Sequence, residues 1–215
     1  MTLLVVAESA RLTLLSCESR VAYARPMSAS EEDSALMLRY RDGDEAAFEM
    51  LYLRHKDPLY RYLLRLSLNR EVAEDVFQEA WGKIIKSRRN YRAAAKFSTF
   101  LYKVARNCLI DYIRRNSRHS HLDGVDPASL ASSADCPLLD TEKAFSRERL
   151  YDALLQLPEE QRDVFLLYEE AGLGIDVIAN ITGANRETVK SRLRYAVAKL
   201  KSYFSEDESI LESRA

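Results

Sequence analysis

The chain has 215 residues and a formal net charge of -1, with 32 Lys and Arg against 33 Asp and Glu. This length allows one or two domains with a real hydrophobic core. Only 6 Gly and 5 Pro interrupt it, which favours helix over sheet. The 3 cysteines form no C-x-x-C pair, as is usual in a reducing cytoplasm. No apolar run reaches the length of a membrane span, so we expect a cytoplasmic protein without membrane insertion.

Residues 1–31 are expected to be a disordered N-terminal extension. The first seventeen residues, MTLLVVAESARLTLLSC, faintly resemble a lipoprotein signal that ends at Cys17. Glu8 and Arg11 interrupt the apolar run, however, and no basic segment precedes it, which argues against export. We expect residues 1–26 to be dispensable, or to result from a start site assigned upstream of a true start at Met27.

The first helical block is predicted over residues 32–117. Apolar residues recur at helical intervals from Asp44 to Leu66. Asn69 is the predicted N-cap of a second helix, whose first turns are acidic. A third helix is expected from Phe97 to about Asn116, after a basic loop over residues 88–96.

A linker is predicted over residues 118–145, which are rich in Ser, Asp and Pro and show no periodicity. His119, His121 and Cys136 fall in this segment, but no fourth ligand stands at a recognised spacing. We therefore expect no metal and no cofactor. Two DNA sites two helical turns apart, about 70 Å, would require this linker to be stretched, as along a large partner.

The second block is predicted over residues 146–205, followed by an acidic tail over residues 206–215. One helix is expected between Pro158 and Gly172 and a short one over residues 175–182, followed by a turn at Gly183. Gly183 is expected to avoid a Cβ clash where the two flanking helices cross closely. Asn185 would cap a last, basic helix with Val189, Leu193 and Leu200 inward and Tyr195 outward, a helix-turn-helix pattern. The alternative is a helical hairpin with an ordinary charged face.

The segment from Gly82 to Arg118 carries eleven bases and one acid, Asp111. Bases with interleaved aromatic residues are typical of surfaces that bind single-stranded nucleic acid, because phosphates meet the bases while nucleobases stack on the rings. Phe97 is predicted to be a core residue. For Tyr91, Phe100 and Tyr102 the pattern leaves core and strand-facing positions equally open.

Five segments together resemble an extracytoplasmic-function (ECF) sigma factor of bacterial RNA polymerase. They read, in order, EAAFEMLYLRHKDPLYRYLLR, NREVAEDVFQEAWGKI, KFSTFLYKVARNCLIDYIRR, LPEEQRDVFLL and TVKSRLRYAVAKL. The resemblance covers residues 40–116 and 146–204. It implies an all-α fold of two small helical domains joined by a linker, and a protein that directs core polymerase to promoters. Phe100 departs from the family pattern, in which many members have Trp.

The resemblance also implies residue roles. Docking on the clamp helices of the largest polymerase subunit would involve Asp75, Gln78 and Glu79, while helices over residues 150–168 would rest on the polymerase flap. Recognition and opening of the upstream bubble would involve Arg88, Arg89, Tyr91, Arg92, Lys96, Phe100, Lys103, Arg106, Asn107, Arg114 and Arg115. The resemblance thus moves Tyr91 and Phe100 to the strand-facing side and leaves Tyr102 open. Reading of duplex DNA would involve Arg186, Glu187, Thr188, Lys190, Ser191 and Arg194.

The predicted function is therefore that of a sigma factor, with core polymerase and promoter DNA, both duplex and single-stranded, as partners. An anti-sigma protein is expected to cover the polymerase-docking faces. No nucleophile–base pair, phosphate loop or metal spacing occurs, so we expect no catalysis. The alternatives are a stand-alone helix-turn-helix regulator and a helical adaptor that only sequesters protein partners.

Overall fold

The computed structural model describes residues 32–93, 95–123 and 149–212, with side chains described as far as residues 116 and 205 in the last two ranges. Every regular element in these ranges is helical, so the predicted all-α fold is confirmed. The elements are α2 (Asp33–Arg41), α3 (Glu45–Ser67), α4 (Arg70–Ser87), the 3-10 turn η1 (Arg88–Asn90), α5 (Phe97–Asp123), a helical run over residues 149–155, α7 (Glu159–Glu169), α8 (Ile175–Thr182) and α9 (Arg186–Glu212). We call residues 32–123 the N-terminal block and residues 149–212 the C-terminal block.

Side-chain caps fix the starts of α3 and α4. The carboxylate of Asp44 accepts hydrogen bonds from the backbone N–H groups of Ala46 and Ala47 at 3.1 and 3.3 Å. The side-chain carbonyl of Asn69 accepts one from the N–H of Val72 at 3.1 Å. Such caps satisfy N–H groups that have no partner inside the helix. The prediction of Asn69 as an N-cap is confirmed.

Aromatic rings fill the middle of the N-terminal block. Trp81 of α4 lies 5.0 Å from Tyr52 and 5.7 Å from Phe48 of α3, measured between ring centroids. Phe48 lies 4.7 Å from Tyr40 of α2. Tilted and edge-to-face ring pairs at these distances add to the free energy gained by burying each ring. The cluster therefore joins three helices around one core.

The helix-turn-helix of the C-terminal block is present as predicted. Gly183 ends α8 with a φ of +71°, and Asn185 caps α9 by accepting a hydrogen bond from the N–H of Thr188 at 2.7 Å. No atom lies within 4 Å of the position that a Cβ on Gly183 would take. The expected Cβ clash is thus absent, and the left-handed backbone is what favours glycine there. The predicted inward residues of α9, Val189, Leu193 and Leu200, are buried.

Two helices are longer than predicted. The third predicted helix was expected to end near Asn116, but α5 continues to Asp123, into the predicted linker. The last helix continues past Phe204 to Glu212, into the predicted tail. Neither extension contains Gly or Pro, so nothing in the sequence breaks the helix before Gly124 in the first case. The rest of the predicted linker, residues 124–145, and the predicted extension over residues 1–31 lie outside the described residues.

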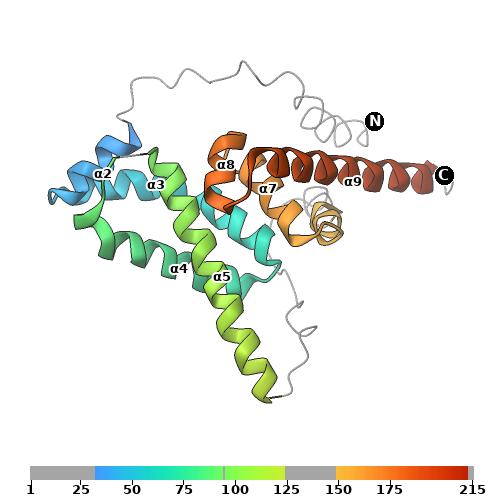
Figure 1. Cartoon of the computed structure of the whole chain (residues 1–215), viewed down its shortest axis with the longest axis horizontal. Coiled ribbons are helices and arrows are strands. Elements are labelled where there is room, and N and C mark those ends of the chain that lie inside the picture. Colours follow the sequence, from blue (N-terminus) through green and yellow to red (C-terminus); the bar gives the residue numbers. More distant parts are fainter. Residues whose placement is uncertain (1–31, 94, 124–148, 213–215) are drawn as a thin grey trace.

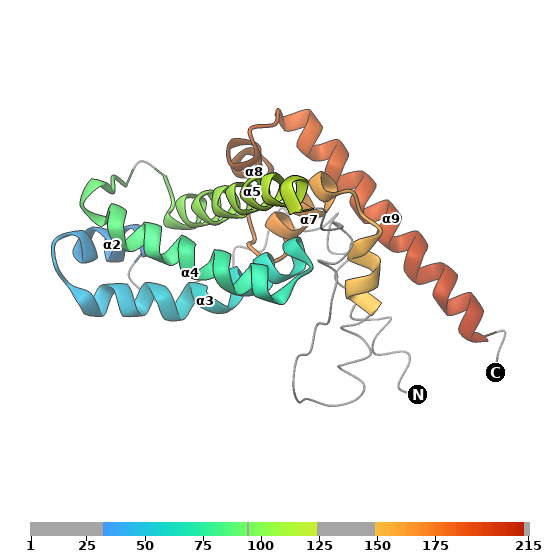
Figure 2. The ribbon, with the colours of Figure 1, turned by 90° about the horizontal axis from the view of Figure 1, so that it is seen from below.

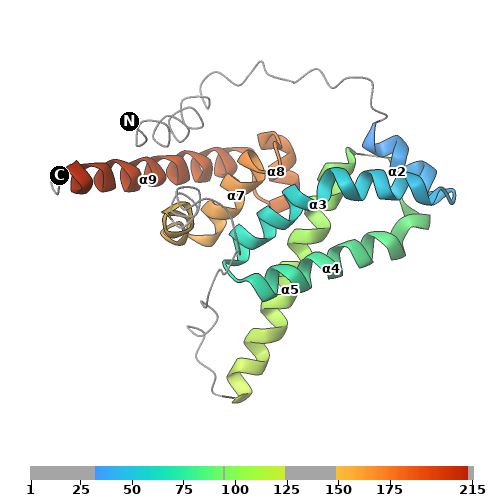
Figure 3. The ribbon, with the colours of Figure 1, turned by 180° about the vertical axis from the view of Figure 1, so that it is seen from behind.

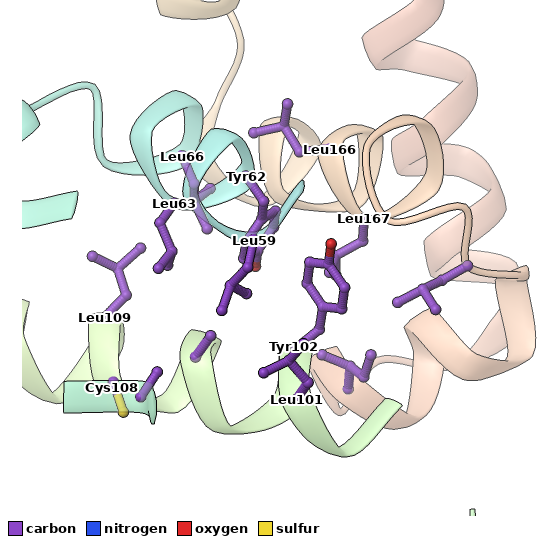
Figure 4. Close-up of a cluster of buried hydrophobic side chains, with 14 of the residues drawn as sticks. Leu59, Tyr62, Leu63, Leu66, Leu101, Tyr102, Cys108, Leu109, Leu166 and Leu167 are labelled. Carbon is purple, nitrogen blue, oxygen red and sulfur yellow. The ribbon is translucent and has the colours of Figure 1, made fainter. Parts of the chain in front are cut away.

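The two blocks pack against each other. Figures 1 and 3 show α7 and α8 between the N-terminal block and the long helix α9, and Figure 2 shows α9 crossing at an angle to α3, α4 and α5. Buried residues of both blocks form one continuous hydrophobic cluster. In Figure 4, Tyr62 of α3, Tyr102 of α5 and Leu167 of α7 point into the space between the blocks. This interdomain packing was not anticipated from the sequence.

Candidate nucleic-acid interfaces

The basic loop between α4 and α5 lies at the surface of the N-terminal block. Arg89, Arg92 and Lys96 are exposed. Arg88 is held differently, because its guanidinium lies 5.2 Å from the ring centroid of Tyr40. This cation–π contact anchors the start of the loop on α2. The loop therefore exposes the positive charges of Arg89, Arg92 and Lys96, while Arg88 fixes its start on α2.

The aromatic residues near the loop divide into buried and partly buried rings. Phe97 is 1% exposed, so its predicted core position is confirmed. Tyr102, which the pattern left open, is a core residue with 2% exposure. Phe100 is partly buried between Tyr91 and Phe97, at centroid distances of 5.5 and 6.4 Å.

Tyr91 is the predicted strand-facing residue that the structure places inside. Its exposure is 6%, and its buried hydroxyl has no hydrogen-bond partner among the described residues. The Tyr91 ring packs edge-to-face against the ring of Phe100. In this conformation Phe100 is thus the aromatic side chain available beside the basic loop, and Tyr91 is not.

Two basic residues of α5, Lys103 and Arg106, face the C-terminal block. The guanidinium of Arg106 donates a hydrogen bond to the carboxylate of Asp163 in α7 at 2.6 Å. The Lys103 ammonium donates to the side-chain carbonyl of Asn180 in α8 at 3.3 Å. Burial alone would lower the pKa of Arg106, but the Asp163 carboxylate outweighs this and raises it above its usual value. Both residues, which the family resemblance assigns to DNA contact, are therefore bound to the C-terminal block in this conformation.

Farther along α5, the predicted DNA-contacting residues Asn107, Arg114 and Arg115 are exposed. Arg115 donates a hydrogen bond to Glu79 of α4 at 2.8 Å. Glu79 also pairs with Lys83 at 2.8 Å. The hydrogen bond from Lys83, helped by Arg115, keeps the pKa of the Glu79 carboxyl below its usual value.

The predicted polymerase-docking residues lie on the outer side of α4. Asp75 and Gln78 are exposed, whereas Glu79 is half-buried and ion-paired. The exposed pair is separated by three positions, which places both side chains on one helix face. Glu79 connects this face to the basic end of α5 through Arg115.

The outward face of α9 is organised by short-range pairs. Arg186 makes hydrogen bonds to both carboxylate oxygens of Asp176 in α8, at 2.6 and 2.8 Å. Lys190 pairs with Glu187 at 2.8 Å and lowers the pKa of that carboxyl. The guanidinium of Arg194 lies 5.1 Å from the ring centroid of the next residue, which was predicted to face outward. The remaining predicted residues of this face are Thr188 and Ser191, both partly exposed.

Tyr195 is that neighbouring aromatic, and it is 55% exposed. It was absent from the predicted contact residues, although a helical wheel places it outward. An exposed ring on a helix that presents charges to DNA is a candidate contact for a thymine methyl group or a base face.

The sequence prediction missed the residues that join the two blocks. Tyr62 donates a hydrogen bond to Asp163 at 2.8 Å, and Glu170, the residue directly after α7, pairs with Arg61 at 3.1 Å and with Arg65. One signal was available, because Asp163 directly precedes the apolar run Val-Phe-Leu-Leu. A carboxylate on the apolar side of a helix calls for a partner.

In the described part of the chain, no group of three or more His, Cys, Asp and Glu side chains is placed to hold a metal ion. The side chains of His119, His121 and Cys136 lie outside the described residues. None of the described helices combines the length and apolar character that crossing a membrane requires.

Family models match in both blocks. Sigma-70 region 2 matches residues 51–119, and Sigma-70 region 4 matches residues 147–200. The RNA polymerase sigma factor CarQ of Myxococcus xanthus is 31% identical over 177 residues, which cover 80% of this chain and 97% of CarQ. The ECF RNA polymerase sigma factor SigM of Mycobacterium tuberculosis is 30% identical over 170 residues, or 78% of this chain and 82% of SigM.

A solved structure shares the fold. The sigma factor RpoE of Bartonella quintana, crystallised with the anti-sigma factor NepR, superimposes with a TM-score of 0.64 at 24% identity, over 74% of this chain and 96% of RpoE. Sigma-70 region 2 matches in the N-terminal block and region 4 in the C-terminal block, and the chain covers 97% of CarQ and 82% of SigM. The chain belongs to the ECF sigma factors, the initiation factors that direct bacterial RNA polymerase to promoters.

Proposed function

We propose that the exposed part of the loop and of α5 contacts the upstream edge of the transcription bubble. Arg89, Arg92 and Lys96 would meet phosphates, and the partly exposed Phe100 would stack on an unpaired base. The observation that carries this assignment is Phe100, held against Tyr91 beside three exposed bases. Asn107, Arg114 and Arg115 would extend the contact along the same helix.

On the same basis, Asp75 and Gln78 would dock on the polymerase clamp, with Glu79 and its partner Arg115 linking that face to DNA. The outward face of α9 would read duplex DNA, since Arg186 and Lys190 are fixed by local ion pairs and so lose little freedom on binding. We also propose that the chain works in the cytoplasm, catalyses no reaction itself and is held inactive by an anti-sigma protein, as RpoE is bound by NepR.

The proposal is tested by reconstituting the protein with core polymerase and following promoter opening on a linear template. Phe100→Ala should slow opening by about tenfold, because one stacking contact contributes roughly 1–3 kcal/mol. Lys96→Ala should slow it by a smaller factor, because it removes one phosphate contact. The same variants should initiate normally on a template with a pre-opened bubble. Lys201→Ala, which removes an exposed base from the far part of α9, is the matched control and should change neither rate.

Two outcomes would contradict the assignment. Loss of polymerase binding in Phe100→Ala would mean that the residue belongs to a docking or core surface. Tight, sequence-specific binding of the free protein to duplex DNA, without promoter-specific transcripts when polymerase is added, would favour a stand-alone helix-turn-helix regulator.

A further inference from the structure

Five polar contacts between described residues of the two blocks share one pattern, in which the N-terminal block supplies the donor and the C-terminal block supplies the acceptor oxygen. In four of them the N-terminal block supplies a base and the C-terminal block supplies an oxygen: Arg61 and Arg65 with Glu170, Lys103 with Asn180, and Arg106 with Asp163. In the fifth, the Tyr62 hydroxyl donates to Asp163. The carboxylates of Asp163 in α7 and of Glu170 directly after it thus occupy a strip of positive charge on α3 and α5, as the phosphates of a nucleic acid would.

Asp163 is the single buried charged residue in the described part of the chain, at 4% exposure. Both of its side-chain partners, Tyr62 and Arg106, come from the other block. If the blocks separate, its carboxylate faces water. A buried ion pair is a weak source of net stability, because removing two charges from water offsets most of their attraction. Replacing both members of such a pair by apolar side chains often holds two surfaces together at least as well, so the charged pair is suited to a contact that opens.

The contact also borders an open surface pocket. This pocket of about 400 Å³ lies beside the Arg106–Asp163 pair, and its other lining residues come from α7, the turn of the helix-turn-helix and α9. Interfaces with a large polar part resemble transient contacts rather than obligate ones. The apolar part, which includes Tyr62 and Tyr102, provides the remaining attraction.

We propose that the C-terminal block is an intramolecular cover for the N-terminal block's basic strip, formed by Arg61, Arg65, Lys103 and Arg106. The strip is a binding surface for the phosphate backbone of promoter DNA, and α7 must leave it before DNA can bind. The DNA part of this proposal rests on the contact proposed above between α5 and promoter DNA. It extends that contact to Lys103 and Arg106, which the family resemblance assigns to it, and adds Arg61 and Arg65 as phosphate contacts. The closure itself stands on the contacts alone.

Closure should lower the apparent affinity of the chain for polymerase and for DNA. A ligand that binds only the open chain has an apparent affinity reduced by the fraction of open molecules. Asp163→Asn keeps the size of the side chain and an acceptor for Tyr62 but removes the charge that Arg106 faces. Hydrogen bonds to charged groups contribute enough for the open-to-closed ratio to rise about tenfold. Apparent affinity for core polymerase and for DNA should rise with it.

The first measurement is energy transfer between dyes on Ala46→Cys in α3 and Lys201→Cys in α9, both exposed positions, in a full-length chain that also carries Cys17→Ser and Cys136→Ser. The remaining Cys108 is fully buried, which protects it from labelling. Asp163→Asn and Glu170→Gln should each lower the transfer. Glu160→Gln, which removes a carboxylate from the same helix but breaks only a pair with Arg192 inside the C-terminal block, should leave it unchanged.

The second measurement is the affinity of the same variants for core polymerase and for a fork-junction DNA taken from a transcribed promoter. Tighter binding by Asp163→Asn and Glu170→Gln, with wild-type affinity in Glu160→Gln, is the expected result. Unchanged energy transfer and unchanged affinity in both variants would overturn the closure. Lower transfer with unchanged affinities would overturn its role as a cover.

The DNA part is tested separately with Arg61→Gln and Arg65→Gln in the Asp163→Asn background. Each should weaken binding of the fork-junction DNA by a few-fold and reduce its salt dependence. If they do not, the strip is not a phosphate site. In that case, the function proposed for Phe100 and Lys96 is untouched, since its test uses other residues.

Discussion

The two blocks use charge in different ways. In the C-terminal block, the charges on the outward face of α9 are held by pairs close in sequence, such as Lys190 with Glu187 three residues before it and Arg186 with Asp176 ten residues before it. In the N-terminal block, the bases at the covered strip find partners 57 to 109 residues away. A face built from local pairs keeps its form when the blocks separate, whereas the strip changes its partners. Only the strip on α3 and α5 therefore changes its contacts when the conformation of the whole chain changes.

The blocks also differ in what holds them together, and the aromatic core of the N-terminal block gives the largest expected effect. Trp81→Ala should destabilise the protein by about 3–5 kcal/mol, because it removes a buried ring that contacts Tyr52, Phe48 and Phe77 and leaves a cavity. Urea unfolding followed by circular dichroism measures the loss. The aliphatic core of the C-terminal block provides the comparison, since Val189→Ala should cost clearly less.

A pH titration tests whether the contact between the blocks depends on Tyr102. Burial raises the pKa of Tyr102 to about 12, above its ordinary value near 10, with Arg61 opposing the shift. The folded state therefore holds this proton more tightly than the unfolded state, so stability is fully present below pH 10 and is lost as the pH rises toward 12. The loss attributable to this residue is roughly 3 kcal/mol.

Tyr102→Phe is the matched variant for that titration. It should flatten the fall in unfolding free energy between pH 10 and 12, while leaving the neutral-pH value within about 1 kcal/mol of wild type. The fall should not vanish, because burial also raises the pKa of Tyr62 well above its usual value, with the Asp163 carboxylate adding to the shift. An unchanged alkaline profile would show that Tyr102 is exposed in solution, and hence that the blocks are apart.

Helix ends in the two blocks provide a smaller, paired test. Gly183 and Leu68 both end a helix with a left-handed backbone, at φ of +71° and +55°. Gly183→Ala should cost about 1 kcal/mol, since a side chain makes that backbone unfavourable. Leu68→Gly relieves the same strain in the N-terminal block and should cost less than an ordinary leucine truncation. Thermal unfolding of both variants measures the contrast.

The smallest expected effect on stability is at the outward face of α9. Tyr195→Ala should change the free energy of unfolding by no more than about 0.5 kcal/mol, because the ring is exposed. Its effect should appear in DNA selection by the reconstituted holoenzyme, as a relaxed preference at one position of the upstream element. Replacing thymine by deoxyuridine, which removes only the methyl group, would show whether the ring reads that methyl.

Local signals explain what could be predicted from the sequence. Asn69, Gly183 and Asn185 mark helix ends because capping and left-handed turns depend on a few neighbouring residues. The burial of Tyr91 could not be predicted from a helical period, because Tyr91 lies in the loop between η1 and α5. Tyr102 does lie in α5, but its burial could not be predicted either. A helical wheel assumes one buried face, but α5 packs on α3 and α4 and also on α8 of the other block. A helix between several partners has more than one buried side, and periodicity does not identify the second.

The ion pairs at the covered strip have a consequence for how DNA binding responds to ionic strength. Salt weakens phosphate contacts by making counterion release less favourable. Salt also weakens the more exposed pairs of Arg61 and Arg65 with Glu170, which helps to free the strip. The two responses oppose each other. A plot of the logarithm of the binding constant against the logarithm of salt concentration should therefore be shallower for the whole chain than its number of phosphate contacts would give.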